Sequence, residues 1–311
     1  MKELKETFNF YDQTYIKSYN LDKSIQYQLN LLDSLDVYTR KHCENVATIT
    51  CNLCKKLHLS RGFTEYCTIC AYLHDVGKLF IPSSILQKPS QLTNEEYEIM
   101  KKHTTLGYQL CIKDTKLRPY YAGAYYHHEC LDGTGYPQGL VKKDIPFEAQ
   151  IIKVADEYDA LVNKRQYKSH IGISDALKII IENTKPSPNA PENTGYTRSG
   201  KVNKRIVKKL LKVVIDDIEY ELSCVMDYVD SLKKEIERYK KIDYYISKKL
   251  SAKTENQKMY YDEYIKIYLH QGESIDEFNQ LYKELLDAYE FRKSNVIDLY
   301  KEIKIIKKLH I

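Results

Sequence analysis

Histidine and carboxylate side chains gather in two short motifs in the first half of this 311-residue chain. One is His74-Asp75-Val76-Gly77-Lys78. The other is the stretch 127–137, in which His127 and His128 precede a glycine-punctuated turn. Six of the nine histidines lie between residues 42 and 128, and five of these (His42, His74, His103, His127 and His128) are the candidates for a shared site. Imidazole and carboxylate together are ligands of hydrolytic metal centres, and soluble domains rarely gather histidines without a metal or a proton to move. The pattern therefore predicts a metal centre.

A two-metal hydrolase needs one carboxylate that bridges two ions about 3.5–4 Å apart, with histidines to complete each shell and a water or hydroxide between the ions as nucleophile. His74 and Asp75 suit this requirement, because adjacent residues at a helix end can reach neighbouring ions. His42 is expected on the preceding helix, His103 on the following one and Asp156 on a later one. Helices that converge on one point are how all-α folds build metal centres.

Apolar residues recur at intervals of three and four from Ser24 onward, as in Ile25, Leu29 and Leu32, which predicts helices. Start signals stand at Ile81–Ser84 and at 93–96, where Thr93 precedes acidic residues. No run of alternating strands is present, so this part is predicted to be all-α. The expected helices are 24–35, 38–57, 64–73, 97–111, 120–129 and 146–161.

The last third of the chain carries heptad patterns. Apolar residues follow a strict heptad spacing over 215–236 and repeat it over 275–306, and residues 259–269 are helical but less regular. Such an apolar stripe needs a partner helix, so we expect a small bundle or a coiled coil, and the second option is compatible with a homodimer. The basic run 201–212 is interpreted as a solvated helix face rather than a nucleic-acid site.

These patterns divide the chain into three parts. Residues 1–23 form a leader or accessory helix, residues 24–212 a catalytic domain, and residues 213–311 a helical C-terminal module. Proline and glycine among polar residues predict a mobile loop at 183–200 within the expected catalytic domain. The length suits one large or two modest domains.

The composition excludes several classes. The net charge of +5 is spread over many lysine and glutamate residues and does not favour a nucleic-acid polymer as partner. No apolar run could span a membrane, and the first residues lack a signal-peptide apolar region, so a cytoplasmic protein with eight reduced cysteines is expected. His58, His170, His270 and His310 are interpreted as incidental surface residues.

Two cysteine pairs, Cys51 with Cys54 and Cys67 with Cys70, have the nominal spacing of a zinc ribbon. Both pairs fall inside helical patterns that lack the glycine or proline of zinc knuckles. Core packing is therefore the preferred interpretation, and a structural zinc is the alternative.

The ordered set of motifs resembles the HD superfamily of phosphohydrolases and, within it, the HD-GYP group of cyclic dinucleotide phosphodiesterases. The order and intervals match over residues 24–181. The matching stretches are Asp36–His42, His74–Lys78, Ile85–Pro89, Lys102–Thr104, His127–Pro137 and Val154–Leu161.

The resemblance implies an HD-type helical catalytic domain with two divalent ions, typically iron or manganese, although other transition metals fit a His-rich shell. One ion would be held by His42, His74, Asp75 and Asp156. The other would be held by Asp75, His103, His127 and His128, so that Asp75 bridges the two and is catalytic.

The resemblance also implies the substrate contacts. Lys78 would contact the substrate phosphate and assist the leaving group, and Arg165 and Lys168 would bind phosphate. The loop beside the site would be shaped by Gly133, Gly135, Tyr136 and Pro137. Tyr38 stands where some family members have a glutamate for a third ion, which favours two ions here. Asn45, Gln150 and Gln166 replace family residues that are not ligands.

The expected reaction is hydrolysis of cyclic di-GMP to linear pGpG, and in some family members on to GMP, by a metal-bridging hydroxide. Another cyclic dinucleotide is an alternative substrate. A catalytically silent protein that binds a cyclic dinucleotide or a protein partner is the competing class, with loss of ligands as its signature, and none is lost here. A nucleotide phosphohydrolase acting on monoesters is a third class, which the intact Gly133–Pro137 loop disfavours.

Overall fold

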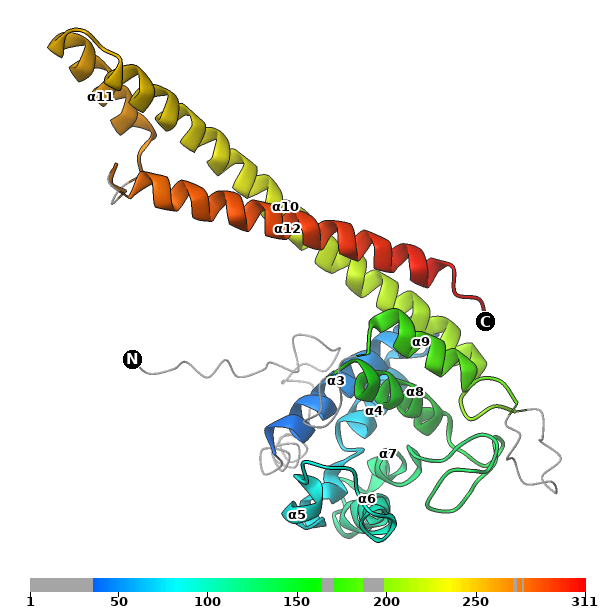
Figure 1. Cartoon of the computed structure of the whole chain (residues 1–311). Helices are drawn as coiled ribbons and strands as arrows, with labels where there is room; N and C mark the ends of the chain where they lie inside the picture. Colours follow the sequence, from blue (N-terminus) through cyan, green and yellow to red (C-terminus); the bar gives the residue numbers. More distant parts are fainter. Residues whose placement is uncertain (1–35, 164–170, 187–198, 271–272, 276) are drawn as a thin grey trace. The chain divides into compact units, whose positions relative to one another are not determined.

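The computed structural model of the chain describes residues 36–163, 171–186, 199–270, 273–275 and 277–311 (Figure 1). Its regular elements are helices, and within these ranges the β pairing consists of an isolated bridge between Asp132 and Val141. The all-α fold class predicted from the sequence is confirmed. The predicted leader 1–23 and helix 24–35 lie outside the described residues, as does 187–198 of the predicted mobile loop.

Helices α3 (Val37–Lys56) and α4 (Arg61–Tyr72) begin where a polar side chain caps the first free backbone N–H groups. Asp36 accepts hydrogen bonds from the backbone of Tyr38 and Thr39, and Ser60 accepts one from Phe63. The cap at Ser60 starts α4 three residues before the predicted start. The two helices pack against each other.

The short helices η3 (Val76–Phe80) and α5 (Ser83–Leu86) lead into α6 (Asn94–Lys113). Thr93 and Glu96 form a reciprocal capping box at the start of α6, as the sequence signal predicts. The turn after α4 packs backbone to backbone on α6, because a Cβ at Gly77 would meet the His103 carbonyl oxygen at 1.9 Å. This close approach carries Asp75 toward α6.

Helix α7 (Tyr121–Tyr126), which follows η4 (Arg118–Tyr120), is shorter than predicted. The predicted continuation to Glu129 is wrong, because the chain turns at His127. The buried Glu129 carboxylate accepts hydrogen bonds from the backbone of Gln138 and Leu140 and so belongs to the following loop.

Helix α8 (Phe147–Val162) packs against α3 and is followed by α9 (Ile173–Glu182). The side of α8 that carries Asp156 and Asp159 is buried. The packing of α8 on α3 therefore places these carboxylates beside His42.

Two compact units can be distinguished, one formed by residues up to Val214 together with 309–311, and the other by Ile215–Lys308. The second contains most of α10 (Lys204–Leu250), with α11 (Glu255–Tyr268) and α12 (Phe278–Lys307). Helix α10 is continuous through the boundary between the units, and the division into domains made from the sequence stays a prediction.

Helix α10 packs on α11 and α12 of the same chain. Tyr239 and Ile242 of α10 share a buried cluster with Ile265 of α11 and Phe278 of α12. Further along α10 and α12, Lys307 pairs with Glu219 at 2.9 Å, and the Arg292 guanidinium lies 5.5 Å from the Tyr228 ring centroid. Figure 1 shows α12 running beside α10. The intrachain bundle is therefore present, and a homodimer through these helices stays a prediction.

None of the described helices combines the length and the apolar composition needed to cross a bilayer.

Candidate metal centre

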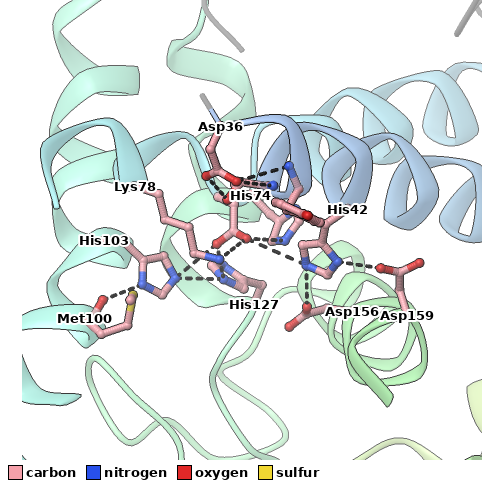
Figure 2. Close-up of polar contacts among 12 residues, drawn as sticks. Asp36, His42, His74, Lys78, Met100, His103, His127, Asp156 and Asp159 are labelled. Carbon is pink, nitrogen blue, oxygen red and sulfur yellow. Dashed lines mark hydrogen bonds and ion pairs between the residues drawn. The ribbon is translucent and has the colours of Figure 1, made fainter. Parts of the chain in front are cut away.

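Two groups of metal-ligating side chains meet inside the first unit. His42, His74 and Asp75 form one group, and His103, His127 and His128 form the other. Each group draws on different elements: α3 and the end of α4 supply the first, and α6 and the end of α7 supply the second. Figure 2 shows His103 and His127 on one side of the cluster and His42, with Asp156 and Asp159, on the other.

Asp75 lies between the two groups. Its Oδ2 is 3.3 Å from His74 Nε2 and 3.7 Å from His42 Nε2. Its Oδ1 is 3.4 Å from His103 Nε2 and 4.0 Å from His127 Nε2. One carboxylate thus presents one oxygen to each set of imidazoles, which is the arrangement required of a bridging ligand.

The Nδ1 atoms of the histidines are bonded outside the cluster. Main-chain carbonyl oxygens accept from His74 (Ala71 O, 2.6 Å), His103 (Met100 O, 2.6 Å) and His127 (Gly123 O, 2.8 Å). A carbonyl only accepts, so each Nδ1 carries the hydrogen, and the Nε2 lone pair of each neutral ring points to the centre. Metal-ligating histidines in proteins are held in this way.

The buried nitrogen atoms in the cluster fit a cation. His42 Nε2 and His74 Nε2 are buried and make no hydrogen bond. His103 Nε2 and His127 Nε2 lie 3.2 Å apart, although their Nδ1 bonds leave both as lone-pair donors. Buried polar atoms without partners are costly, and two converging lone pairs repel. A divalent ion in each group would satisfy all four atoms.

Burial and neighbouring charges set the protonation of this cluster. Burial, with the adjacent imidazoles, holds the pKa of His127 and His128 well below the ordinary value, and burial also lowers the pKa of His103. Burial alone would raise the pKa of Asp75, but the Lys78 ammonium and the histidines keep it well below its usual range. Neutral imidazoles beside an ionised carboxylate are the forms that bind metal.

His42 is held by two carboxylates of α8. Its Nε2 lies 3.0 Å from Asp156 Oδ1, and its Nδ1 lies 2.6 Å from Asp159 Oδ2. Burial lowers the pKa of His42, but the neighbouring Asp156 and Asp159 carboxylates outweigh burial and raise this pKa to about 9. Asp156 stands on the cluster side of the ring, and Asp159 orients the ring from behind.

Of the predicted substrate contacts, Lys78 lies inside the cluster. Its ammonium is 2.5 Å from Asp75 Oδ2, and its side chain is 12% exposed. The Lys78 side chain therefore places a positive charge at the centre of the cluster and is still partly accessible to solvent. Arg165 and Lys168 lie outside the described residues.

The loop after α7 borders the second histidine group. The Tyr136 ring stacks on the His128 ring, with centroids 4.6 Å apart and planes 25° from parallel. Gly135 allows this course, because a Cβ there would meet the Cys130 backbone nitrogen at 2.2 Å. Gly133 has a φ of 81°, and Tyr136-Pro137 is a cis peptide bond. The predicted loop residues Gly133–Pro137 thus lie beside the histidines.

Two residues that contribute to the site, Asp159 and Glu129, were not predicted to have a role from the sequence. Asp159 is three residues after Asp156, and this spacing on a helix places both carboxylates on one face, a signal that was available. Glu129 directly follows the two histidines, but its role depends on backbone N–H groups of a distant part of the loop. No local pattern reveals that contact.

The remaining histidines and the cysteine pairs lie elsewhere. His58, His270 and His310 are exposed, and His170 is outside the described residues. The paired cysteines are fully buried in the core, and within the described ranges no cysteine belongs to a group of three or more potential metal ligands. They are Cys51, Cys54, Cys67 and Cys70.

Comparisons with known proteins give the family of this chain. The HD domain family model matches residues 26–186. A cyclic di-GMP phosphodiesterase of Thermotoga maritima is 39% identical over 155 residues, which are 49% of this chain and 42% of that protein. A 3'3'-cGAMP-specific phosphodiesterase of Vibrio cholerae is 35% identical over 153 residues, which are 49% of this chain and 33% of that protein.

A solved HDG"Y"P protein of Bdellovibrio bacteriovorus aligns with 23% identity and a TM-score of 0.44, over 56% of this chain and 52% of its own. The chain spans less than half the length of the two curated relatives. The match to the family model covers more than half of this chain and contains every residue of both histidine groups. The chain therefore belongs to the HD domain family, and within it to the HD-GYP type.

Proposed function

We propose that this chain is a metal-dependent phosphodiesterase that hydrolyses cyclic di-GMP to linear pGpG. The observation that carries the proposal is the position of Asp75, which presents one oxygen to each of two histidine groups. Relatives that share about half of this chain carry the names cyclic di-GMP phosphodiesterase and cGAMP-specific phosphodiesterase, which supports a cyclic dinucleotide as substrate.

The residues divide between two ions. His42, His74, Asp75 and Asp156 would hold one, and Asp75, His103, His127 and His128 the other. Iron or manganese suits this nitrogen and oxygen donor set. When bound, such ions would polarise the phosphoryl group and lower the pKa of a water so that it attacks phosphorus near neutral pH.

The chain's own groups position the substrate. The Lys78 ammonium lies beside the bridging carboxylate, where it can pair with a phosphate oxygen and give a proton to the departing oxygen of the cut ester. Glu129 accepts hydrogen bonds from the backbone of Gln138 and Leu140, directly after the loop 133–137, and the Tyr136 ring stacks on His128. In the proposed complex, these contacts would keep the loop beside the histidines while the diester is bound there.

Turnover of cyclic di-GMP tests the proposal. The full chain would be purified anaerobically, loaded with Fe(II) or Mn(II), and its products separated by chromatography. Asp75→Ala would be run alongside, with Asp144→Ala, a change at an exposed carboxylate, as the matched control. The account expects turnover in the wild type and the control and none in Asp75→Ala. Metal-loaded wild type without turnover of any cyclic dinucleotide would overturn it.

A competing proposal is a silent cyclic-dinucleotide-binding or protein-interaction scaffold. In that case Asp75→Ala would leave partner binding unchanged, and no product would form with either metal. All seven candidate ligand positions are retained, which argues against this alternative. Buried Nε2 atoms without hydrogen-bond partners are costly, and a scaffold that binds no metal would gain nothing from them.

A further inference from the structure

A tyrosine and lysine cluster extends from the second histidine group to the surface of α6. The Tyr136 ring, stacked on His128, lies 5.7 Å from the Lys101 ammonium, which in turn lies 5.4 Å from the Tyr97 ring centroid. Burial raises the pKa of the Tyr136 phenol, and the neighbouring Tyr97 and the Asp75 and Asp156 carboxylates raise it further. Tyr97, Lys101 and Tyr136 are therefore in contact with one another, and the innermost covers a candidate metal ligand.

The outer members of this cluster are accessible. Tyr97 is 48% exposed, and the Lys101 side chain is 27% exposed. The two residues are four apart on α6 and so share one face of the helix. An open aromatic ring beside an accessible ammonium is a combination that binds nucleotides, because bases stack on the ring and the cation pairs with phosphate.

Lys101 can exchange its present partner. It pairs with Glu98, whose side chain is 65% exposed, and ion pairs this exposed contribute little. Two other lysines near the histidines are held more firmly: Lys78 lies against the buried Asp75, and the buried Lys153 lies 3.1 Å from Glu157. Lys101 is thus well placed to meet an anion that arrives from solvent.

We propose that Tyr97 and Lys101 form a subsite for the half of the cyclic dinucleotide that is not being cut, with Tyr97 stacking on its purine and Lys101 pairing with its phosphate. The inference rests on the proposed function, because a ring with two phosphodiesters must place the second one outside the metal centre while the first is attacked. Tyr136 connects the metal centre with the proposed subsite, because its ring stacks on His128 and also lies beside the Lys101 ammonium.

Kinetics of the manganese-loaded full chain test the subsite with two substrates. Cyclic di-GMP has purines and a second phosphate, whereas bis(p-nitrophenyl) phosphate has one diester and neither feature. The subsite variants are Lys101→Met and Tyr97→Leu. The controls are Tyr97→Phe, which keeps the ring, and Lys102→Met, which removes the same charge from the neighbouring exposed lysine.

The expected result is selective. Lys101→Met and Tyr97→Leu should each raise KM for cyclic di-GMP about tenfold, in the range of a lost base-stacking or phosphate contact. Their kcat, and their kcat/KM for bis(p-nitrophenyl) phosphate, should stay within about twofold of the wild type, because the transition-state contacts are untouched. Both controls should match the wild type. The Kd of a phosphorothioate analogue of cyclic di-GMP should weaken in parallel with KM.

Three outcomes would overturn the inference. Unchanged KM in both subsite variants, with the wild type active on cyclic di-GMP, would remove the subsite and leave the proposed function standing. Equal losses on both substrates would mean that the variants disturb the metal centre instead. A wild type that cuts bis(p-nitrophenyl) phosphate but neither binds nor cuts cyclic di-GMP would end the proposed substrate and the subsite together.

Discussion

His42 Nδ1 lies 2.6 Å from Asp159 Oδ2, so the carboxylate sets the angle at which the opposite nitrogen of the ring enters the metal cluster. Asn163 donates a further hydrogen bond to Asp159, which fixes the carboxylate in turn. Asn163 and Asp159 therefore orient the candidate ligand His42 from outside the cluster.

Asp159→Ala should weaken metal binding without removing any ligand. Loss of such an orienting partner typically costs about 10- to 100-fold in metal affinity. Titration of the metal-free protein with Mn(II), followed by calorimetry, measures the change. Asp175→Ala removes an exposed carboxylate from α9 and is the matched control. An affinity equal to that of wild type in Asp159→Ala would show that His42 needs no orienting partner or is not a ligand.

Metal removal should lower the thermal stability of the chain. A ligand that binds the folded state alone stabilises it by about 2.7 kcal/mol at one hundred times its dissociation constant. A chelator should therefore lower Tm, and added Mn(II) should restore it. Asp75→Asn keeps the volume of the bridging side chain but not its charge, so its Tm should respond much less. An equal response in both proteins would place the stabilising ion elsewhere.

Gly77→Ala should destabilise the fold and distort the cluster. The added Cβ would meet the His103 carbonyl oxygen at 1.9 Å, and because backbone cannot move aside cheaply, overpacking of this kind costs about 1–3 kcal/mol or more. Denaturant unfolding measures the loss. Gly62→Ala is the control, since a Cβ at Gly62 has no neighbour within 4 Å and α4 should gain up to about 1 kcal/mol from alanine. Equal stability of the two variants would contradict the close packing of η3 on α6.

The Arg238 and Glu273 pair should make the C-terminal unit sensitive to acid. Arg238 Nη1 and Nη2 donate to the two Glu273 oxygens at 2.7 and 2.8 Å, and this bonding lowers the pKa of Glu273 to about 2. A depressed pKa stabilises the fold above the unfolded value of 4.5, and the contribution is lost as pH falls from about 5 to 2. The wild type should therefore be more stable than Glu273→Gln at pH 7.

Thermal unfolding of both proteins from pH 7 to pH 2.5 checks the sign. The difference in Tm should be largest above pH 5 and should shrink toward zero as the solution becomes more acidic. Other carboxylates titrate equally in the two proteins and cancel in the difference. A difference that stays constant, or that grows on acidification, would contradict the assignment.

The sequence predicts the helices well where caps and apolar spacing agree. Thr93 and the acidic residues after it predict the start of α6, and Thr93 and Glu96 form a capping box there in the structure. The end of α7 is missed because Glu129 is fixed by a contact nine and eleven residues away, with the backbone of Gln138 and Leu140. A heptad pattern also does not say which helix covers it, so the packing of α10 on α12 within one chain required the structure.

The candidate ligands could be named from the sequence because the ordered set of motifs resembles the HD superfamily, which implies a role for each of them. The structure brings these residues together, and it adds what spacing does not contain: the division of the Asp75 oxygens and the outward Nδ1 bonds. The stacking of Tyr136 between His128 and Lys101 likewise joins residues from two distant segments.

The most direct test of the central claim, that Asp75 bridges two ions, is the metal content and the electron paramagnetic resonance spectrum of the Mn(II)-reconstituted chain. The account predicts two ions per wild-type chain with the spectrum of a coupled pair, because one carboxylate would be shared by both ions. Asp75→Asn should lose the coupling and at least one ion. A wild type that binds a single ion, or an Asp75→Asn variant that keeps two coupled ions, would contradict the account.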